Sequence, residues 1–366
     1  MNLNINNSIL FPALSKVAGV VDPRPTLAIL ANVLLNVGPD GLRLTATDME
    51  VELTASIDGN FGPAGDITIP ARKLFDICRA LPETAEISLV VDGERVNVSS
   101  ERSRFSLLSL PAQEFPLVEP AETEVQLSIS QNVFKSLLEQ TAFAMAKQDV
   151  RYYLNGVLLE AQQDRLRAVA TDGHRLALCD VDVTIPTEVS RQLILPRKGV
   201  QELLRLVGES DAEMQIVMSK NQVRITVDNY VFTSKLIDGK YPDYNRVIPE
   251  LSENVVLAER EPLKQSLSRA SILSSDKYRG VKITLEQNKL RALVHSPDQE
   301  QAEDEIDVEY AGDNLEVGFN VTYLHDAVNI IQTDKVRLSV SSPKSGCLVL
   351  PEDGGKCKYI VMPLLL

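Results

Sequence analysis

The stretch LRLTATDMEVELTA at residues 42–55 recurs as LRAVATDGHRLALC at residues 166–179, so the shared Leu-Arg moves by 124 positions, from 42 to 166. A weaker third copy, LRALVHSPDQEQAE, begins at residue 290, another 124 positions on. Two further landmarks move by 126 positions, because IPARK at 69–73 returns as LPRK at 195–198 and LPAQEFP at 110–116 returns as LIDGKYP at 236–242. Self-similarity at a nearly fixed step indicates a repeated architecture. We therefore expect three modules of about 120 residues, each of ordinary domain size.

The expected modules span residues 1–124, 125–252 and 253–366, because the polar, proline-containing stretches 119–124 and 249–254 are typical of linkers. Apolar residues at helical spacing predict two helices in each module. The six helix windows are 8–20, 72–80, 131–147, 197–207, 262–277 and 321–332. The intervening stretches alternate with period two and are joined by turn signals, which favours antiparallel sheets. The fold class is therefore α+β, with three repeated domains of antiparallel sheet plus two helices each.

The composition is that of a globular protein, with 366 residues of which 44% are hydrophobic. No basic segment precedes an apolar run at the N-terminus, and no 18 uncharged apolar residues occur together, so neither a signal peptide nor a membrane span is predicted. We expect a cytoplasmic protein. The four cysteines lack the spacing of a zinc site, and we expect them to be unpaired, although Cys347 and Cys357 could pair or act as ligands.

Charge is unevenly distributed along the chain. The net charge is −14, yet the six helix windows together carry +7, which leaves −21 for the other residues. If the helices share one side of the molecule, that side can face phosphates while the rest repels DNA. Lysine and arginine on helices also serve solubility, so charge alone leaves both interpretations open. A few basic contacts per module would give weak, salt-sensitive DNA affinity.

The sequence holds no recognisable catalytic motif. There is no GxGxxG, GxxxxGK[ST], GxSxG or HExxH, and the three histidines lack metal-ligand spacing, so we expect neither a metal nor a cofactor. Asp172 and His174 could form an acid–base pair, which leaves a hydrolase as the alternative from another class. The repeat counterpart of this segment, TDMEV at 47–51, lacks the histidine, which favours a structural turn and a protein that is not an enzyme.

Several motifs, taken together, resemble a known family. PRPT at 23–26, RYYLNG at 151–156, ATDGHRL at 170–176, FTSKL at 232–236, YPDY at 241–244 and VMP at 361–363 are similar to those of the beta sliding clamps of bacterial DNA polymerase III. The resemblance spans essentially the whole chain. It implies a head-to-tail homodimeric ring that encircles duplex DNA without reading its sequence and acts as a replication processivity factor. A closed ring is held on DNA by topology, which explains how an acidic protein can work there.

The resemblance also implies partners and a peptide-docking pocket between the second and third modules. The partners are the DNA polymerase III alpha subunit, the clamp loader delta subunit, and other polymerases and repair proteins that carry clamp-binding peptides. An apolar groove containing methionine suits related peptides from many proteins. The implied pocket residues are Leu154, Thr171, Gly173, His174, Arg175, Leu176, Pro242, Arg246, Val247, Tyr278, Asn320, Tyr323, Val361, Met362, Pro363 and Leu364. For each aliphatic residue in this set, ordinary core packing is the competing interpretation.

Two further sets follow from the same resemblance. The residues expected near DNA are Arg24, Gln148, Tyr152 and Tyr153, whose types suit phosphate contact and base stacking. At the dimer interface, Ile272 and Leu273 would meet Phe105 and Leu107, with Arg72 and Lys73 opposite Asp298 and Glu300.

The sequence also departs from the family. The final Leu364-Leu365-Leu366 lacks the positive charge often found near the family's end. Gly346 stands where a small or hydroxyl-bearing residue is usual, and Lys344 stands where an apolar residue is usual. Partner preference in that part of the pocket is therefore open. A repeat scaffold that never meets DNA is a further alternative, and the basic helices disfavour it.

Overall fold

A computed structural model describes residues 2–185, 190–274, 279–295 and 299–365. Tyr278 and Asp298, expected at the pocket and the dimer interface, lie outside these residues. The chain divides into two compact units. The first contains residues 1–135, 183–191 and 198–236, and the second contains residues 136–182, 192–197 and 237–366.

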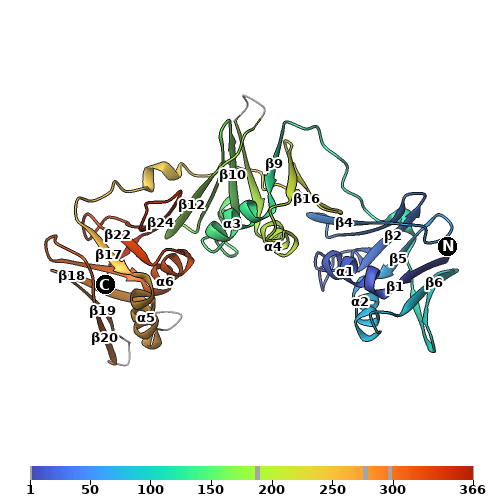
Figure 1. Cartoon of the computed structure of the whole chain (residues 1–366), viewed down its shortest axis with the longest axis horizontal. Coiled ribbons are helices and arrows are strands. Elements are labelled where there is room, and N and C mark those ends of the chain that lie inside the picture. The colour runs from blue at the N-terminus through green and yellow to red at the C-terminus, as the bar shows by residue number, and fades with distance from the viewer. Residues whose placement is uncertain (1, 186–189, 275–278, 296–298, 366) are drawn as a thin grey trace. The chain divides into compact units, whose positions relative to one another are not determined.

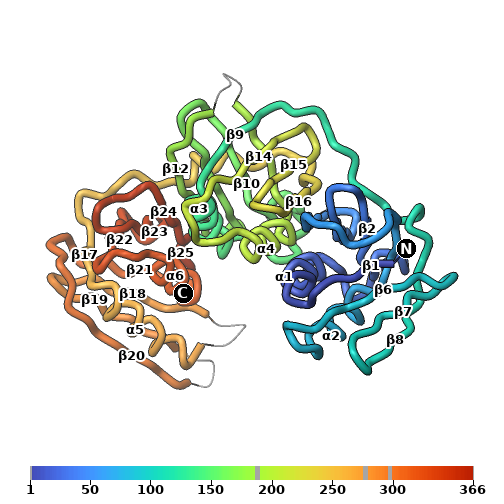
Figure 2. Tube along the Cα trace, turned by 45° about the vertical axis from the view of Figure 1, so that its right-hand side comes forward, coloured from blue at the N-terminus to red at the C-terminus, as the bar shows by residue number. Residues whose placement is uncertain are grey.

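The first unit contains two antiparallel sheets, most of whose strands are labelled in Figure 1 or Figure 2. Their strand orders are β1-β6-β7-β8 and β5-β2-β3-β4-β16-β15-β14-β9. The strands of this unit are β1 (Asn2–Asn6), β2 (Asn32–Gly38), β3 (Gly41–Thr47), β4 (Val51–Asp58), β5 (Gly65–Pro70), β6 (Glu86–Asp92), β7 (Arg95–Ser100), β8 (Ser103–Leu108), β9 (Val125–Ser130), β14 (Glu213–Met218), β15 (Gln222–Val227) and β16 (Tyr230–Lys235).

The second unit repeats this plan with an eight-stranded sheet of order β13-β10-β11-β12-β24-β23-β22-β17 and a five-stranded sheet of order β20-β19-β18-β21-β25. Its strands are β10 (Gly156–Gln162), β11 (Arg165–Thr171), β12 (Arg175–Asp182), β13 (Arg191–Pro196), β17 (Val255–Glu259), β18 (Gly280–Glu286), β19 (Lys289–His295), β20 (Gln301–Asp307), β21 (Leu315–Asn320), β22 (Lys335–Ser339), β23 (Cys347–Pro351), β24 (Cys357–Val361) and β25 (Pro363–Leu364).

Each predicted helix window overlaps one α-helix among the described residues, which confirms the α+β class. The helices are α1 (Asn7–Val17), α2 (Ala71–Ala80), α3 (Gln131–Ala142), α4 (Arg197–Leu206), α5 (Arg260–Ala270) and α6 (Val321–Ile330). The third and fifth windows were too long, because α3 ends at Ala142 and α5 ends at Ala270. The Arg197 guanidinium donates to the carbonyls of Met145 (2.7 Å) and Ala146 (3.1 Å), which holds the segment after α3 in an irregular conformation. The stretches 119–124 and 249–254 contain no helix or strand.

The helices begin and pack as their sequences dictate. The Asn6 carboxamide accepts from the Ser8 N–H at 3.0 Å and so caps α1, whose Leu10, Leu14 and Val17 are fully buried. Helix α1 packs on α2 and against β3 and β4, and α5 packs on α6 and against β19 and β20. These helices therefore bury an apolar stripe against the strands that they contact.

Each eight-stranded sheet is assembled from two neighbouring modules. Strand β4 of the first module pairs with β16 of the second, and β12 of the second pairs with β24 of the third. The second pairing places Arg175 opposite Val361 and Leu176 opposite Ile360. This shared-sheet construction was not predicted, because a period-two pattern does not identify a strand's partner.

One expectation about the cysteines is wrong. Cys179 on β12 and Cys357 on β24 form a disulfide, with Cα atoms 4.0 Å apart, because the two residues lie directly opposite each other in the antiparallel register. Cys78 and Cys347 are free and buried, so Cys357 pairs with Cys179 and not with Cys347. Across the described ranges, no helix combines the length and apolar character needed to cross a bilayer.

Candidate functional site

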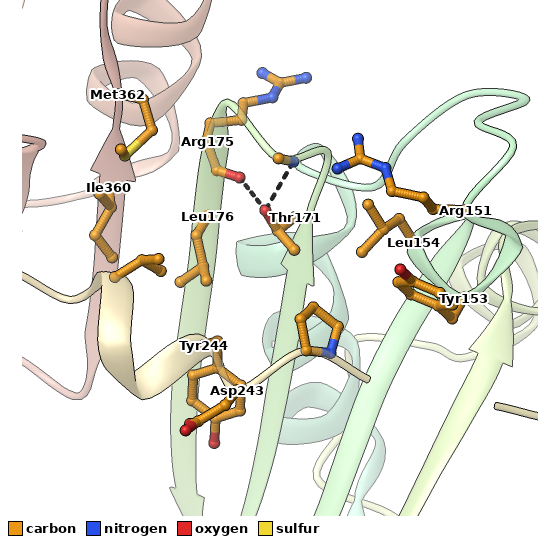
Figure 3. A pocket seen from close by; sticks show the side chains of 13 residues that line it. Arg151, Tyr153, Leu154, Thr171, Arg175, Leu176, Asp243, Tyr244, Ile360 and Met362 are labelled. Atoms are coloured by element: carbon orange, nitrogen blue, oxygen red, sulfur yellow. Dashed lines mark hydrogen bonds between the residues drawn. The ribbon is translucent and has the colours of Figure 1, made fainter. Parts of the chain in front are cut away.

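A cavity of about 200 Å³ lies in the second unit, where β12 and β24 pair. Figure 3 shows its side chains converging from β11, β12, β24 and two short 3-10 helices, η3 (Tyr152–Leu154) and η4 (Tyr244–Val247). The lining residues are Arg151, Tyr153, Leu154, Thr171, Gly173, Arg175, Leu176, Pro242, Asp243, Tyr244, Val247, Ile360 and Met362. The lining is mainly aliphatic and aromatic with a few polar groups, which is typical of a recognition pocket.

The turn between β11 and β12 forms one rim of the pocket. The Thr171 hydroxyl donates to the Arg175 carbonyl (2.6 Å) and accepts from the Gly173 N–H (3.0 Å), as Figure 3 shows. The Asp172 carboxylate accepts from the N–H groups of His174 (2.9 Å) and Arg175 (3.0 Å). Gly173 has φ +90, and a Cβ there would lie 3.0 Å from the Arg151 guanidinium. Glycine is therefore favoured at this position, because it adopts a positive φ readily and has no Cβ to crowd Arg151.

The Arg175 side chain anchors this rim to the rest of the unit. Its guanidinium pairs with Asp172 (3.1 Å) and with Asp326 of α6 (2.6 Å), and it lies 4.4 Å from the centroid of the Tyr323 ring. It also donates to the Phe143 carbonyl at 2.8 Å. The side chain is only 12% exposed, so its charge needs these partners.

The C-terminal segment closes the opposite side of the pocket. The Met362 N–H donates to the His174 carbonyl at 2.8 Å, which continues the β12–β24 pairing by one residue and holds Met362 at the cavity. Pro363 and Leu364 form β25, which pairs with Phe319 and Gly318 on β21. A flexible thioether at the rim can adapt to differently shaped apolar side chains.

Eight of the expected pocket residues line the cavity, namely Leu154, Thr171, Gly173, Arg175, Leu176, Pro242, Val247 and Met362. Seven others do not line it. They are His174, Arg246, Asn320, Tyr323, Val361, Pro363 and Leu364. Several of these have structural contacts: Asn320 caps α6, Tyr323 stacks on Arg175, Arg246 pairs with Asp243 at 2.8 Å, and Val361 is buried.

Five lining residues were not expected at the pocket, namely Arg151, Tyr153, Asp243, Tyr244 and Ile360. All five fall within or beside the sequence motifs at 151–156, 241–244 and 361–363, so these motifs contribute more of the cavity lining than the expected set included. Arg151 bonds Asp149, which lowers the pKa of that carboxyl to about 2 and fixes the edge of the pocket.

The residues expected near DNA are exposed, with one exception. Arg24, Gln148 and Tyr152 are exposed, whereas Tyr153 is half-buried and belongs to the pocket. The two neighbouring tyrosine rings meet edge-on, with centroids 5.7 Å apart. Tyr152 is therefore available to solvent, while Tyr153 faces the cavity.

The expected dimer residues lie on surface elements. Phe105 is 39% exposed on β8 and Ile272 is 76% exposed in η5 (Ser271–Leu273), whereas Leu107 is buried within its own unit and Leu273 is half-buried. Arg72 and Lys73 are exposed on α2, and Glu300 is exposed just before β20.

The geometry gives no support to acid–base chemistry at Asp172 and His174. The Asp172 carboxylate binds two backbone N–H groups and the Arg175 guanidinium, and these contacts belong to a turn. Within the residues that the structure describes, no cluster of three or more His, Cys, Asp or Glu could hold a metal.

Comparisons with known proteins cover the chain from end to end. Family models described as the N-terminal, central and C-terminal domains of the DNA polymerase III beta subunit match residues 1–119, 128–243 and 245–365. The beta sliding clamps of Pseudomonas aeruginosa and Escherichia coli are 46% and 43% identical to it, with 100% of each chain covered.

Solved structures agree with these matches. A DNA polymerase sliding clamp from Pseudomonas aeruginosa with ligand, 46% identical, superimposes with a TM-score of 0.97 over 100% of both chains. A Pseudomonas aeruginosa sliding clamp bound to griselimycin, also 46% identical and covered over 100% of both chains, superimposes with a TM-score of 0.96.

Proposed function

The chain belongs to the DNA polymerase III beta subunit family and is a processivity clamp of DNA replication, and from this membership we propose that two copies close head to tail around duplex DNA. The hydrolase alternative has no support. The clamp acts as a non-catalytic accessory subunit, because its contribution is to hold the polymerase on the template. Such a protein is expected to work in the cytoplasm, where bacterial chromosomes are replicated.

The pocket at the β12–β24 seam is the proposed docking site for the polymerase. The observation that carries this assignment is an apolar cavity whose walls include an adaptable Met362 and a small number of fixed polar groups. This combination suits extended peptides that insert apolar side chains, and it allows peptides of different shapes to bind. The alpha subunit, the clamp loader delta subunit, and other polymerases and repair proteins are the proposed partners. A related clamp bound to griselimycin supports a ligand-binding role.

DNA would be held by topology, with only weak direct contact. Arg24, Gln148 and Tyr152 are exposed polar or aromatic groups that can approach phosphates or unpaired bases. A net charge of −14 opposes strong nonspecific binding, so a closed ring explains retention on DNA better than affinity does.

Retention on circular and linearised DNA tests the proposal. The clamp is loaded by the clamp loader onto nicked circular DNA, and half of the sample is then cut with a restriction enzyme. We expect protein to remain on the circle during gel filtration in high salt and to leave the linear DNA. Equal retention on both would contradict the ring.

A further inference from the structure

Tyr244 links the pocket to a buried polar cluster. Its ring lines the cavity, and its hydroxyl points away from it and donates to the Glu160 carboxylate. The same hydroxyl accepts from the Arg167 guanidinium at 3.1 Å. Arg167 in turn forms a two-point pair with Asp180, at 2.6 and 2.7 Å. The second Glu160 oxygen accepts from the Gln192 carboxamide.

The cluster is costly to build and fully partnered. Glu160 is 4% exposed, and a carboxylate at that depth is tolerated only when its oxygens are bonded. Both of its oxygens accept hydrogen bonds, and the Arg167 charge is offset by Asp180. A polar network inside an apolar core fixes one geometry, because any shift leaves a buried group unbonded.

The first module shows that this cluster is not needed to build the sheet. By the repeat steps of 124 and 126, the counterparts of Glu160, Gln192 and Tyr244 are Asn36, Asp66 and Val118. Asn36 and Asp66 also bond each other across two strands, but Asp66 is exposed and, among the described residues, no tyrosine hydroxyl bonds the pair. The buried carboxylate and its tyrosine therefore accompany the module that carries the pocket.

The wall that Tyr244 anchors has little regular structure of its own. Pro242, Asp243, Tyr244 and Val247 line the cavity from a segment whose only regular element is η4. Two tyrosines of this segment form side-chain hydrogen bonds to the sheet. The Tyr241 hydroxyl lies 3.5 Å from the Val169 carbonyl, and the Tyr244 hydroxyl bonds Glu160. The first of these bonds is long, so the Tyr244 anchor is the stronger one.

We propose that Glu160 and Arg167 are positioning residues that fix the Tyr244 ring, and with it the η4 wall, in the conformation that accepts a peptide. This inference deepens the proposed function and rests on it. A preorganised wall lowers the ordering cost of binding. Loss of the anchor should therefore weaken binding mainly by raising the dissociation rate.

Surface plasmon resonance on immobilised DNA polymerase III alpha subunit tests the role. Tyr244→Phe keeps the ring and removes the hydroxyl, and we expect binding roughly tenfold to a hundredfold weaker, the range for a lost hydrogen bond to a charged group. Glu160→Ala should weaken binding by a similar factor. Because both changes break one anchor, the double variant should be no weaker than either single variant.

Rescue and a matched control separate positioning from general stability. Glu160→Gln retains an acceptor for the Tyr244 hydroxyl and should restore binding close to that of the wild type, whereas a purely electrostatic role would give no rescue. Asn36→Ala breaks the repeat-related pair in the first module and should leave binding unchanged. Griselimycin titrations of the same variants should rank them identically. Wild-type affinity in both Tyr244→Phe and Glu160→Ala would overturn the positioning role alone, and a wild type that does not bind the alpha subunit would overturn the proposed function as well.

Discussion

Arg175 lies on the rim of the pocket, and its side chain also holds two elements of the pocket together. Its guanidinium connects the β11–β12 turn to α6 through Asp172, Asp326 and the Tyr323 ring. We expect Arg175→Met to lower the free energy of unfolding by about 2–4 kcal/mol, because two partly buried carboxylates lose their partner. Urea denaturation measures the change. Lys289→Met breaks the exposed pair with Glu305 and should cost under about 1 kcal/mol, so equal losses in both variants would contradict the anchoring role.

Glu52 gives the stability a predictable pH dependence. Burial raises its pKa above the ordinary value of 4.5, although the Val118 N–H and Arg224 oppose the shift. The folded state then binds the proton more tightly than the unfolded chain, so Glu52 lowers stability as the pH rises from 4.5 through its folded pKa.

The substitution Glu52→Gln tests this sign, because the amide keeps an oxygen for the Val118 N–H, now bonded at 2.9 Å. We expect a higher urea midpoint at neutral pH and a gain that shrinks as the pH falls towards 4.5. A gain that is the same at every pH would show that charge is not the cause. Glu50→Gln, exposed two residues away, is the control and should leave the midpoint unchanged.

At the scale of elements, the sequence predicts local structure well and strand partners poorly. The stripe of Leu10, Leu14 and Val17 is enough to place α1, because helical burial follows local spacing. The β12–β24 seam joins residues 178 positions apart in sequence, so the Cys179–Cys357 bond had no local signal. Eight of the expected residues line the cavity, whereas Tyr244 and Ile360 were missed. Tyr244 lies in the YPDY motif but was not assigned to the pocket, and Ile360 looks like an ordinary core residue from sequence alone.

The C-terminal segment is the element whose removal should matter most for function. We expect deletion of residues 362–366 to abolish stimulation of the polymerase in primer-extension assays, because Met362 leaves the pocket rim, while the dimer persists. Lys235 is the repeat counterpart of Met362, and its N–H bonds the Glu50 carbonyl at 2.8 Å just as Met362 bonds His174. Lys235→Ala is therefore a matched control that should retain stimulation. Full stimulation by the truncated protein would mean that the docking site lies elsewhere.

At the scale of the whole molecule, the repeat supports the proposal that one chain is not the complete assembly. In the two eight-stranded sheets, a strand of one module pairs with a strand of the next, as β4 with β16 and β12 with β24. By the same repeat, β8 and β20 are the counterparts left at the two ends of the series, and each is the edge of its sheet in the described chain. An edge strand is a template for pairing with another chain. The module boundaries at 124 and 252 remain predictions from the linker stretches 119–124 and 249–254.

Pairing of β8 with β20 of a second copy would complete the series and close the ring. Charge favours this contact, since β20 is rich in aspartate and glutamate while Arg102 and Arg104 lie at β8. Ile272 in η5, beside β20, adds an exposed apolar anchor. We expect the double variant Ile272→Ala and Leu273→Ala to be a folded monomer by light scattering, because burial of both side chains contributes several kcal/mol at such an interface. Leu251→Ala removes an exposed leucine that is remote from both edge strands in sequence and should stay dimeric. A dimeric mass for the Ile272 and Leu273 variant would place the interface elsewhere.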